Sequence, residues 1–269
     1  MKPALAAAWV CVGVMGFRPA ARADSVRRIY VRAGVAHVAP FATSSELELS
    51  GVQGPSSLAV SNGPVAGSGA AVSSATIPAI TVGYRLALLH NRLALETVLG
   101  LPFAVTFMAT GSLATDSLAP MALGIPTGVP ALGPALGEAK AVPAMLTAVY
   151  DLRAAGRLMP YAGGGLAVLF ARGATITNPI LTEVRQPGFR IPPTPGLVLQ
   201  AGLEARLTRR WYARIDAKFI ALMVVRVEVD NIEIRTPELP LFGTVDVGDA
   251  SMNVTLNPLI IQASIGADF

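Results

Sequence analysis

Residues 211–225, WYARIDAKFIALMVV, alternate between two faces. The face that runs from Trp211 to Met223 is wholly apolar. The other face carries three successive charges and then turns apolar, in the order Tyr212, Arg214, Asp216, Lys218, Ile220, Leu222 and Val224. A period of two predicts a β-strand. In a soluble sandwich the apolar face would meet a protein core, whereas in a transmembrane barrel it would meet lipid and the charges would point into the lumen.

Seven other segments show similar alternation, which gives eight predicted strands. The gaps between them alternate in length, with roughly 34, 5, 35, 6, 24, 4 and 26 residues. Tight turns at one end and long loops at the other are typical of outer-membrane barrels, whose turns face the periplasm, and a soluble sandwich offers no reason for this pattern. The predicted strands cover residues 28–41, 76–86, 92–106, 142–153, 160–171, 196–206, 211–227 and 254–269.

The first 23 residues predict a secretory signal peptide. Lys2 supplies a basic start, residues 4–17 form an apolar core, and the chain then reads A-R-A, an A-x-A cleavage motif. The apolar core is shorter than the roughly 20 residues that a spanning helix needs. We therefore expect residues 1–23 to be removed and residues 24–269 to form one barrel domain.

The composition supports export to a membrane. The chain is 52% apolar and 14% charged, with a mean hydropathy of +0.55, whereas ordinary globular proteins are about 25% charged. After the signal no run approaches 18 apolar residues, so spanning helices are not expected. An exported, apolar chain without such helices predicts a β-barrel of the bacterial outer membrane, in contact with its lipid.

Removal of the signal changes the charge and the thiol content. The formal charge falls from +4 to +1, which is 18 basic minus 17 acidic residues, so basicity is no argument for a nucleic-acid partner. Cys11 is the one cysteine and lies in the signal, which leaves no thiol for disulfides, metal binding or nucleophilic catalysis. We expect no cofactor. We expect the C-terminal strand, which ends at Phe269, to be the part that the barrel assembly machinery recognises, and the oligomeric state stays open.

The charged positions of the predicted strands share one parity and lie mainly near the periplasmic ends. An eight-stranded barrel has an interior just wide enough for side chains to fill, so mixed charges there should pair into a plug. The plug residues are Arg32, Arg85, Glu96, Asp151, Arg153, Glu204, Arg206, Arg214, Asp216, Lys218 and Asp268. The upper lumen is expected to be an apolar channel lined by Val38, Val98, Val198, Ile220, Leu222 and Ile260. Plain space-filling is the alternative interpretation of both sets.

Aromatic residues also cluster at strand ends. All five tyrosines fall at the periplasmic ends of the predicted strands, together with Trp211 and Phe269, whereas Phe41, Phe103, Phe107 and Phe170 fall at the outer ends. We expect these residues to form the two aromatic girdles of a membrane barrel.

Several prolines lie in or beside the strands, toward their outer halves. Proline cannot donate a ladder hydrogen bond, and a closed barrel has no edge on which to place it. Either the prolines mark strand ends, or they open a gap in the wall, for which Pro40, Pro102 and Pro143 are the candidates and Pro78 and Pro258 lie in similar positions.

A set of short motifs, spread in order over residues 24–269, resembles the OmpW family of outer-membrane proteins. The motifs are VRAGVAHVAP at 31–40, ALETVLGLPF at 94–103, VP at 142–143 with LTAVY at 146–150, PYAG at 160–163, LQAGL at 199–203, and LNPLI at 256–260 with the strand that follows to Phe269. The resemblance implies an eight-stranded barrel with a narrow hydrophobic channel for small apolar molecules and a lateral opening. The long, Pro-rich second loop and the apolar third and fourth loops depart from the family, so no substrate is carried over.

These observations lead to a transport hypothesis. An apolar solute enters between the loops, moves down the apolar lumen, is excluded by the charged plug and leaves sideways into lipid, where hydrophobic transfer is favourable. The loop residues involved are Leu132, Leu136, Ile180, Leu181, Leu239, Leu241 and Phe242.

Two other classes of function are an enzyme and an adhesive barrel. A lipid-modifying enzyme needs a nucleophile and a base, but His37 has no serine nearby and His90 lies in a predicted periplasmic turn, at the opposite end. No catalytic residue is therefore expected. Asp246 and Asp249 lack a metal-binding pattern, so no metal site is expected. A structural or adhesive surface barrel, whose loops bind a partner without transport, stays open as the alternative.

Overall fold

The computed structural model describes residues 28–152, 157–239 and 243–269. The predicted signal peptide, residues 1–23, lies outside these residues, and so does the predicted plug residue Arg153. The described chain is almost entirely β-structure. No helix in these three ranges is both long enough and apolar enough to cross a membrane.

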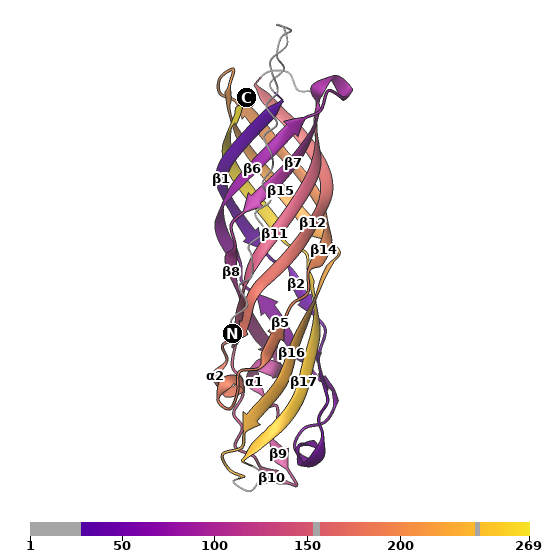
Figure 1. Ribbon diagram of the computed structural model, residues 1–269, viewed down its shortest axis with the longest axis vertical. Coiled ribbons are helices and arrows are strands. Elements are labelled where there is room, and N and C mark those ends of the chain that lie inside the picture. Colours follow the sequence, from indigo (N-terminus) through magenta and orange to yellow (C-terminus); the bar gives the residue numbers. More distant parts are fainter. Residues whose placement is uncertain (1–27, 153–156, 240–242) are drawn as a thin grey trace, which may run out of the picture.

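Eight antiparallel strands close into a barrel, as the alternation predicts. The hydrogen-bonded order is β12-β14-β15-β18-β1-β6-β7-β11, and β11 pairs with β12 to complete the ring. The short turns gather at the end where the C-terminus lies, at the top of Figure 1. The strands are β1 (Ile29–Ala39), β6 (Ala75–Arg85), β7 (Leu93–Gly100), β11 (Ala135–Asp151), β12 (Leu158–Ile176), β14 (Thr194–Arg206), β15 (Trp211–Ala221) and β18 (Leu259–Asp268).

The wall of the barrel continues far into what the sequence presents as loops. On one side β11 and β12 extend alongside β8 (Phe103–Gly111) and β5 (Ser68–Val72). On the other side β16 (Met223–Arg235) and β17 (Thr244–Leu256) form a hairpin, which occupies the lower part of Figure 1. This second sheet also holds β13 (Gly188–Arg190), β2 (Ala42–Ser44), β3 (Leu47–Ser50) and β4 (Gly63–Val65). The part formed by β5, β8 and the outer ends of β11 and β12, together with the second sheet, is called the extension of the barrel.

Short elements lie beside or beyond the two sheets. The pair β9 (Met121–Ala122) and β10 (Ile125–Pro126) forms a separate small ribbon. The helices are α1 (Ser112–Thr115) and α2 (Pro179–Thr182), with 3-10 turns η1 (Gly54–Leu58) and η2 (Leu89–Asn91). In α2 the Asn178 side chain accepts hydrogen bonds from the backbone of Ile180 and Leu181, which caps the helix.

The predicted strand at residues 211–227 is interrupted at Leu222. This residue has φ 61°, a left-handed conformation that breaks the alternation between β15 and β16. After the break the odd positions face inward, so Met223 is 3% exposed while Leu222 is 71% exposed. The prediction that Leu222 lines the channel is therefore wrong. The residue belongs to the outer face because the irregular backbone exchanges the two faces.

The triple glycine of β12 lets two strands approach closely. A Cβ atom on Gly165 would collide with the carbonyl oxygen of Leu146, and one on Gly163 would meet the carbonyl of Ala148. Both contacts are with β11, the pairing partner of β12. The odd positions of β12 from Tyr161 to Ala171 face the interior, which the alternation alone did not decide, and the parity reverses at Gly173, so that Ile176 is buried.

The aromatic residues separate into two groups. Trp211, Tyr84 and Phe269 are exposed at strand ends next to the short turns or the C-terminus, as a girdle requires. The girdle prediction is wrong for Tyr30, Tyr161, Tyr212 and Phe107, which are buried, and for Phe103, which is part-buried and lines an interior cavity. The tyrosines lie on the same inward parity as the charges, and Phe107 lies on the inward face of β8.

Candidate functional site: a charged plug beside two apolar cavities

Arg32 and Glu96 form the centre of a buried network inside the turn half of the barrel. Arg32 contacts Glu96 at 2.7 Å and Asp216 at 3.2 Å. Arg214 contacts the other oxygen of Glu96 at 2.9 Å, and the Tyr30 hydroxyl donates to that oxygen at 2.6 Å. All these side chains are at most 5% exposed. Each charge thus has an opposite charge within hydrogen-bonding distance, as buried ionic groups require.

A second set of ion pairs lies closer to the turns. Arg206 contacts Glu204 at 3.0 Å and Asp268 at 2.5 Å, and Arg85 contacts Asp268 at 3.4 Å. Arg206 also lies over the ring of Tyr212, 5.3 Å from its centroid. Asp151 is half-buried at the end of β11. These residues close the interior at the end where the chain terminates.

Lys218 forms the boundary of the network on the side of the extension. Its Nζ atom contacts Asp216 and donates to the Gln262 side chain at 3.0 Å. Gln262 in turn donates to the Thr81 hydroxyl at 3.3 Å. We call the whole network the plug. Its ion-paired members are five basic and four acidic side chains: Arg32, Arg85, Arg206, Arg214, Lys218, Glu96, Glu204, Asp216 and Asp268.

An apolar cavity of about 80 Å³, the inner cavity, begins where the plug ends. Ile220 and Ile260 line it, and each lies two residues beyond a plug residue on the same face, Lys218 and Gln262 respectively. The interior therefore changes from charged to hydrocarbon within one repeat of the strand. The inner cavity extends to Phe107.

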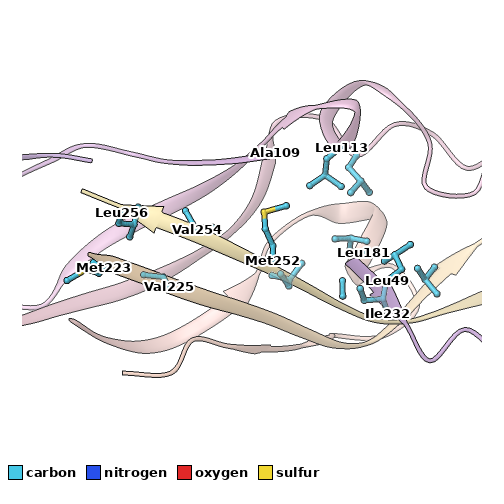
Figure 2. Packing of buried hydrophobic residues seen from close by; sticks show 14 of the residues in the cluster. Leu49, Ala109, Leu113, Leu181, Met223, Val225, Ile232, Met252, Val254 and Leu256 are labelled. Atoms are coloured by element: carbon cyan, nitrogen blue, oxygen red, sulfur yellow. The ribbon is translucent and has the colours of Figure 1, made fainter. Parts of the chain in front are cut away.

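A second apolar cavity of about 70 Å³, the outer cavity, lies in the extension. It is lined from both sheets and from the two short helices, for example by Leu113, Leu181 and Met252, which Figure 2 shows pointing toward a common space. Phe107 lines both cavities. Its ring meets Phe189 of β13 edge to face, with 5.5 Å between centroids. Two apolar spaces thus follow each other along the interior with an aromatic pair at their junction.

The predicted apolar residues reach the interior with one exception. Val38, Ile220 and Ile260 line the inner cavity, Val198 is buried, and Val98 packs against the core. Leu222 lies outside, for the reason given above. Of the loop residues, Leu132, Leu136 and Leu181 line the outer cavity, Ile180 packs beside it, and Leu239 is half-buried but lines neither cavity. Leu241 and Phe242 lie outside the described residues.

The interior residues that sequence reasoning missed are Phe107, Phe189 and Met223. Alternation could have placed Phe107 inside, because it continues the parity of Phe103 and Val105 along β8. No local signal places Phe189, which belongs to a three-residue strand after a long loop. Met223 follows the irregular residue Leu222, whose conformation is not readable from its side chain.

The candidate prolines occupy different positions. Pro40 and Pro143 line the inner cavity, whereas Pro102 is exposed between β7 and β8. The pairing of β11 passes from β7 at Ala144 to β8 at Ala141, so Pro143 faces the interruption that contains Pro102. The wall is irregular at this point.

The two histidines lie far apart in the fold. His37 is on the outer face of β1, and its Nδ1 atom lies 2.8 Å from the Thr76 hydroxyl. His90 is in the η2 turn with φ 60°. Neither is a member of the plug.

Comparisons with known proteins identify the fold and family. The structure of OprG from Pseudomonas aeruginosa superposes with a TM-score of 0.67 and 17% identity, over 90% of this chain and 95% of that one. The outer membrane protein AlkL, determined in lipid bilayers, superposes with a TM-score of 0.54 and 18% identity, over 95% and 97%. A search of curated proteins found no match. A family model, described as the OmpW family, matches residues 27–269. The protein therefore belongs to the OmpW family and is an eight-stranded β-barrel of the bacterial outer membrane.

Proposed function

We propose that the protein is a channel for the passive uptake of small hydrophobic molecules, closed toward the periplasm by the plug and open sideways to the membrane. The observation that carries the proposal is the succession of two apolar cavities, both lined by Phe107, that ends on a network of paired charges. An adhesive barrel needs no such succession of spaces. We also expect the barrel assembly machinery to recognise β18. At the end of this strand the Phe269 amide donates a hydrogen bond to the Ile29 carbonyl at 2.8 Å.

The direction of movement follows from free energies of transfer. An apolar solute gains about 25 cal/mol for each Å² of surface that it removes from water, and both cavities offer that gain. Among the plug residues it would gain nothing, because room for it requires separating buried ion pairs such as Arg32–Glu96. Lipid beside the barrel is as apolar as the cavities. A sideways exit is therefore easier than passage through the plug.

Uptake by vesicles tests this function. Vesicles with a lipopolysaccharide outer leaflet are prepared with and without the protein, and the accumulation of a radiolabelled short alkane is followed with time. We expect faster alkane accumulation with the protein and no change for a sugar of similar size, since a polar solute cannot enter the apolar cavities. Equal alkane rates in both preparations would show that the protein is no such channel.

A further inference from the structure

The end of the barrel that holds the short turns is rich in arginine. The three turns, residues 86–92, 152–157 and 207–210, contain arginines but no aspartate or glutamate. Five arginines that the structure describes lie at this end outside the plug, and all but the half-buried Arg92 are exposed. We call them the rim arginines: Arg28, Arg92, Arg157, Arg209 and Arg210. The turns therefore present positive charge with no acidic residue of their own.

Backbone hydrogen bonds distribute four rim arginines around the whole barrel. The carbonyl of each accepts a hydrogen bond from the amide of a neighbouring strand. The bonds are Arg85 to Arg28 at 2.7 Å, Asp151 to Arg92 at 2.9 Å, Arg206 to Arg157 at 2.9 Å and Asp268 to Arg210 at 3.1 Å. They close the junctions β1/β6, β7/β11, β12/β14 and β15/β18, which are every second junction of the ring. The positive charge thus surrounds the barrel instead of gathering on one side.

The rim arginines form no ion pair with any residue that the structure describes. The acids Glu204 and Asp268 at this end are at most 4% exposed and pair with plug arginines. Two rim arginines contact exposed aromatic residues instead. Arg28 donates to the Tyr84 hydroxyl at 3.5 Å, and Arg210 lies 4.7 Å from the ring centroid of Phe269. The charge of the rim is therefore left for a ligand outside the barrel.

The rim arginines lie beside the lipid-facing surface. Three of them are followed directly in the sequence by an apolar residue that is about half exposed. These pairs are Arg28–Ile29, Arg157–Leu158 and Arg210–Trp211. Arginine is favoured where acyl chains give way to headgroups, because its stem covers apolar surface while the guanidinium reaches the polar layer. Since the turns of outer-membrane barrels face the periplasm, the rim lies at the headgroups of the periplasmic leaflet.

We propose that the rim arginines bind the phosphate groups of anionic phosphoglycerides, such as phosphatidylglycerol, in the periplasmic leaflet. A guanidinium group donates two parallel hydrogen bonds to a phosphate. The acyl chains of the same lipid contact the neighbouring apolar side chains, such as Leu158 and Trp211. An acidic protein would cover the end of the barrel from below, whereas charges spaced around the circumference beside apolar residues suit lipids on every side. This surface is independent of the proposed channel.

Trp211 reports on the lipids that contact the rim. The chain has two tryptophans, Trp9 and Trp211, so in a Trp9→Phe variant the fluorescence comes from the residue next to Arg210. This protein is inserted in phosphatidylcholine vesicles that contain the same fraction of either brominated phosphatidylglycerol or brominated phosphatidylcholine. Bromine on an acyl chain quenches a tryptophan that it touches. The two quenching curves together give the affinity of phosphatidylglycerol relative to phosphatidylcholine.

We expect a preference for phosphatidylglycerol of at least about fivefold, the factor that one arginine near a membrane surface supplies. In the Trp9→Phe background, Arg209→Gln with Arg210→Gln should remove most of this preference, whereas Arg209→Lys with Arg210→Lys should keep part of it, because the charge stays. The matched control is Arg226→Gln with Arg235→Gln. It removes two exposed arginines of the extension and should leave the preference unchanged.

Equal quenching by the two lipids, or a preference that survives Arg209→Gln with Arg210→Gln, would overturn the proposal. Inorganic phosphate carries the same chemical group as the lipid, so it is added at the ionic strength of a sodium chloride control. We expect both salts to weaken the preference equally. Loss of the preference with phosphate alone would assign the rim to free phosphate and overturn the lipid as its ligand. Migration on gels without heating verifies that each variant is folded.

Discussion

Replacing Glu96 by glutamine should lower the free energy of unfolding by about 3–5 kcal/mol, the usual cost of removing one partner from a buried ion pair. The carboxylate is 1% exposed and serves both Arg32 and Arg214. An amide keeps the shape of the side chain but removes one counter-charge from each of two buried guanidinium groups, and leaves Arg32 with Asp216 alone. Urea titration of the barrel in lipid vesicles, followed by tryptophan fluorescence and by migration on gels without heating, measures the loss.

The matched control is Glu183→Gln. Glu183 pairs with Arg235 at 3.1 Å, but both side chains are about half exposed. An exposed ion pair contributes about 0–1 kcal/mol, so this variant should unfold nearly like the wild type. Equal losses for the two variants would contradict the idea that the plug is a set of mutually dependent buried charges.

Replacing Ala167 by tryptophan should abolish most of the alkane uptake. Ala167 lies on the inward face of β12, is 2% exposed and lines the inner cavity. An indole group would fill most of the cavity of about 80 Å³, so it would block the passage. We expect the protein-dependent rate to fall roughly tenfold, because a close-packed interior has no second space to offer.

The neighbouring residue provides the control. Leu166 is 63% exposed on the lipid-facing side of the same strand, and Leu166→Trp adds the same group outside the barrel. This variant should transport like the wild type. Uptake that survives Ala167→Trp in correctly folded protein, judged by gel migration, would contradict passage through the inner cavity.

Alternation predicted the barrel because membrane strands must satisfy every backbone group within a closed sheet and present a different face to lipid and lumen. The same pattern placed Arg32, Glu96 and Lys218 correctly inside. It could not say which charges meet. Arg32 and Asp216 are 184 residues apart in the sequence. They meet only because β18 pairs with β1 on one side and with β15 on the other.

The errors have a common cause. Parity is reliable only while the backbone stays regular, and Leu222 with φ 61° reverses it. The predicted strands were also too short, because residues 63–72 and 135–141 were left as loop although they contain β4, β5 and the first part of β11. Tyrosine at a strand end predicts a girdle in general, but Tyr30 points inward to the carboxylate of Glu96.

The position of a bound solute tests the central claim most directly. Crystals of the protein soaked with a short bromoalkane would locate bromine by anomalous scattering. We predict bromine peaks in the inner and outer cavities, on either side of Phe107, and none among the plug residues between Lys218 and the turns. Bromine between Arg32 and Arg206 would contradict it, because an apolar solute would then pass through the charges that are proposed to exclude it.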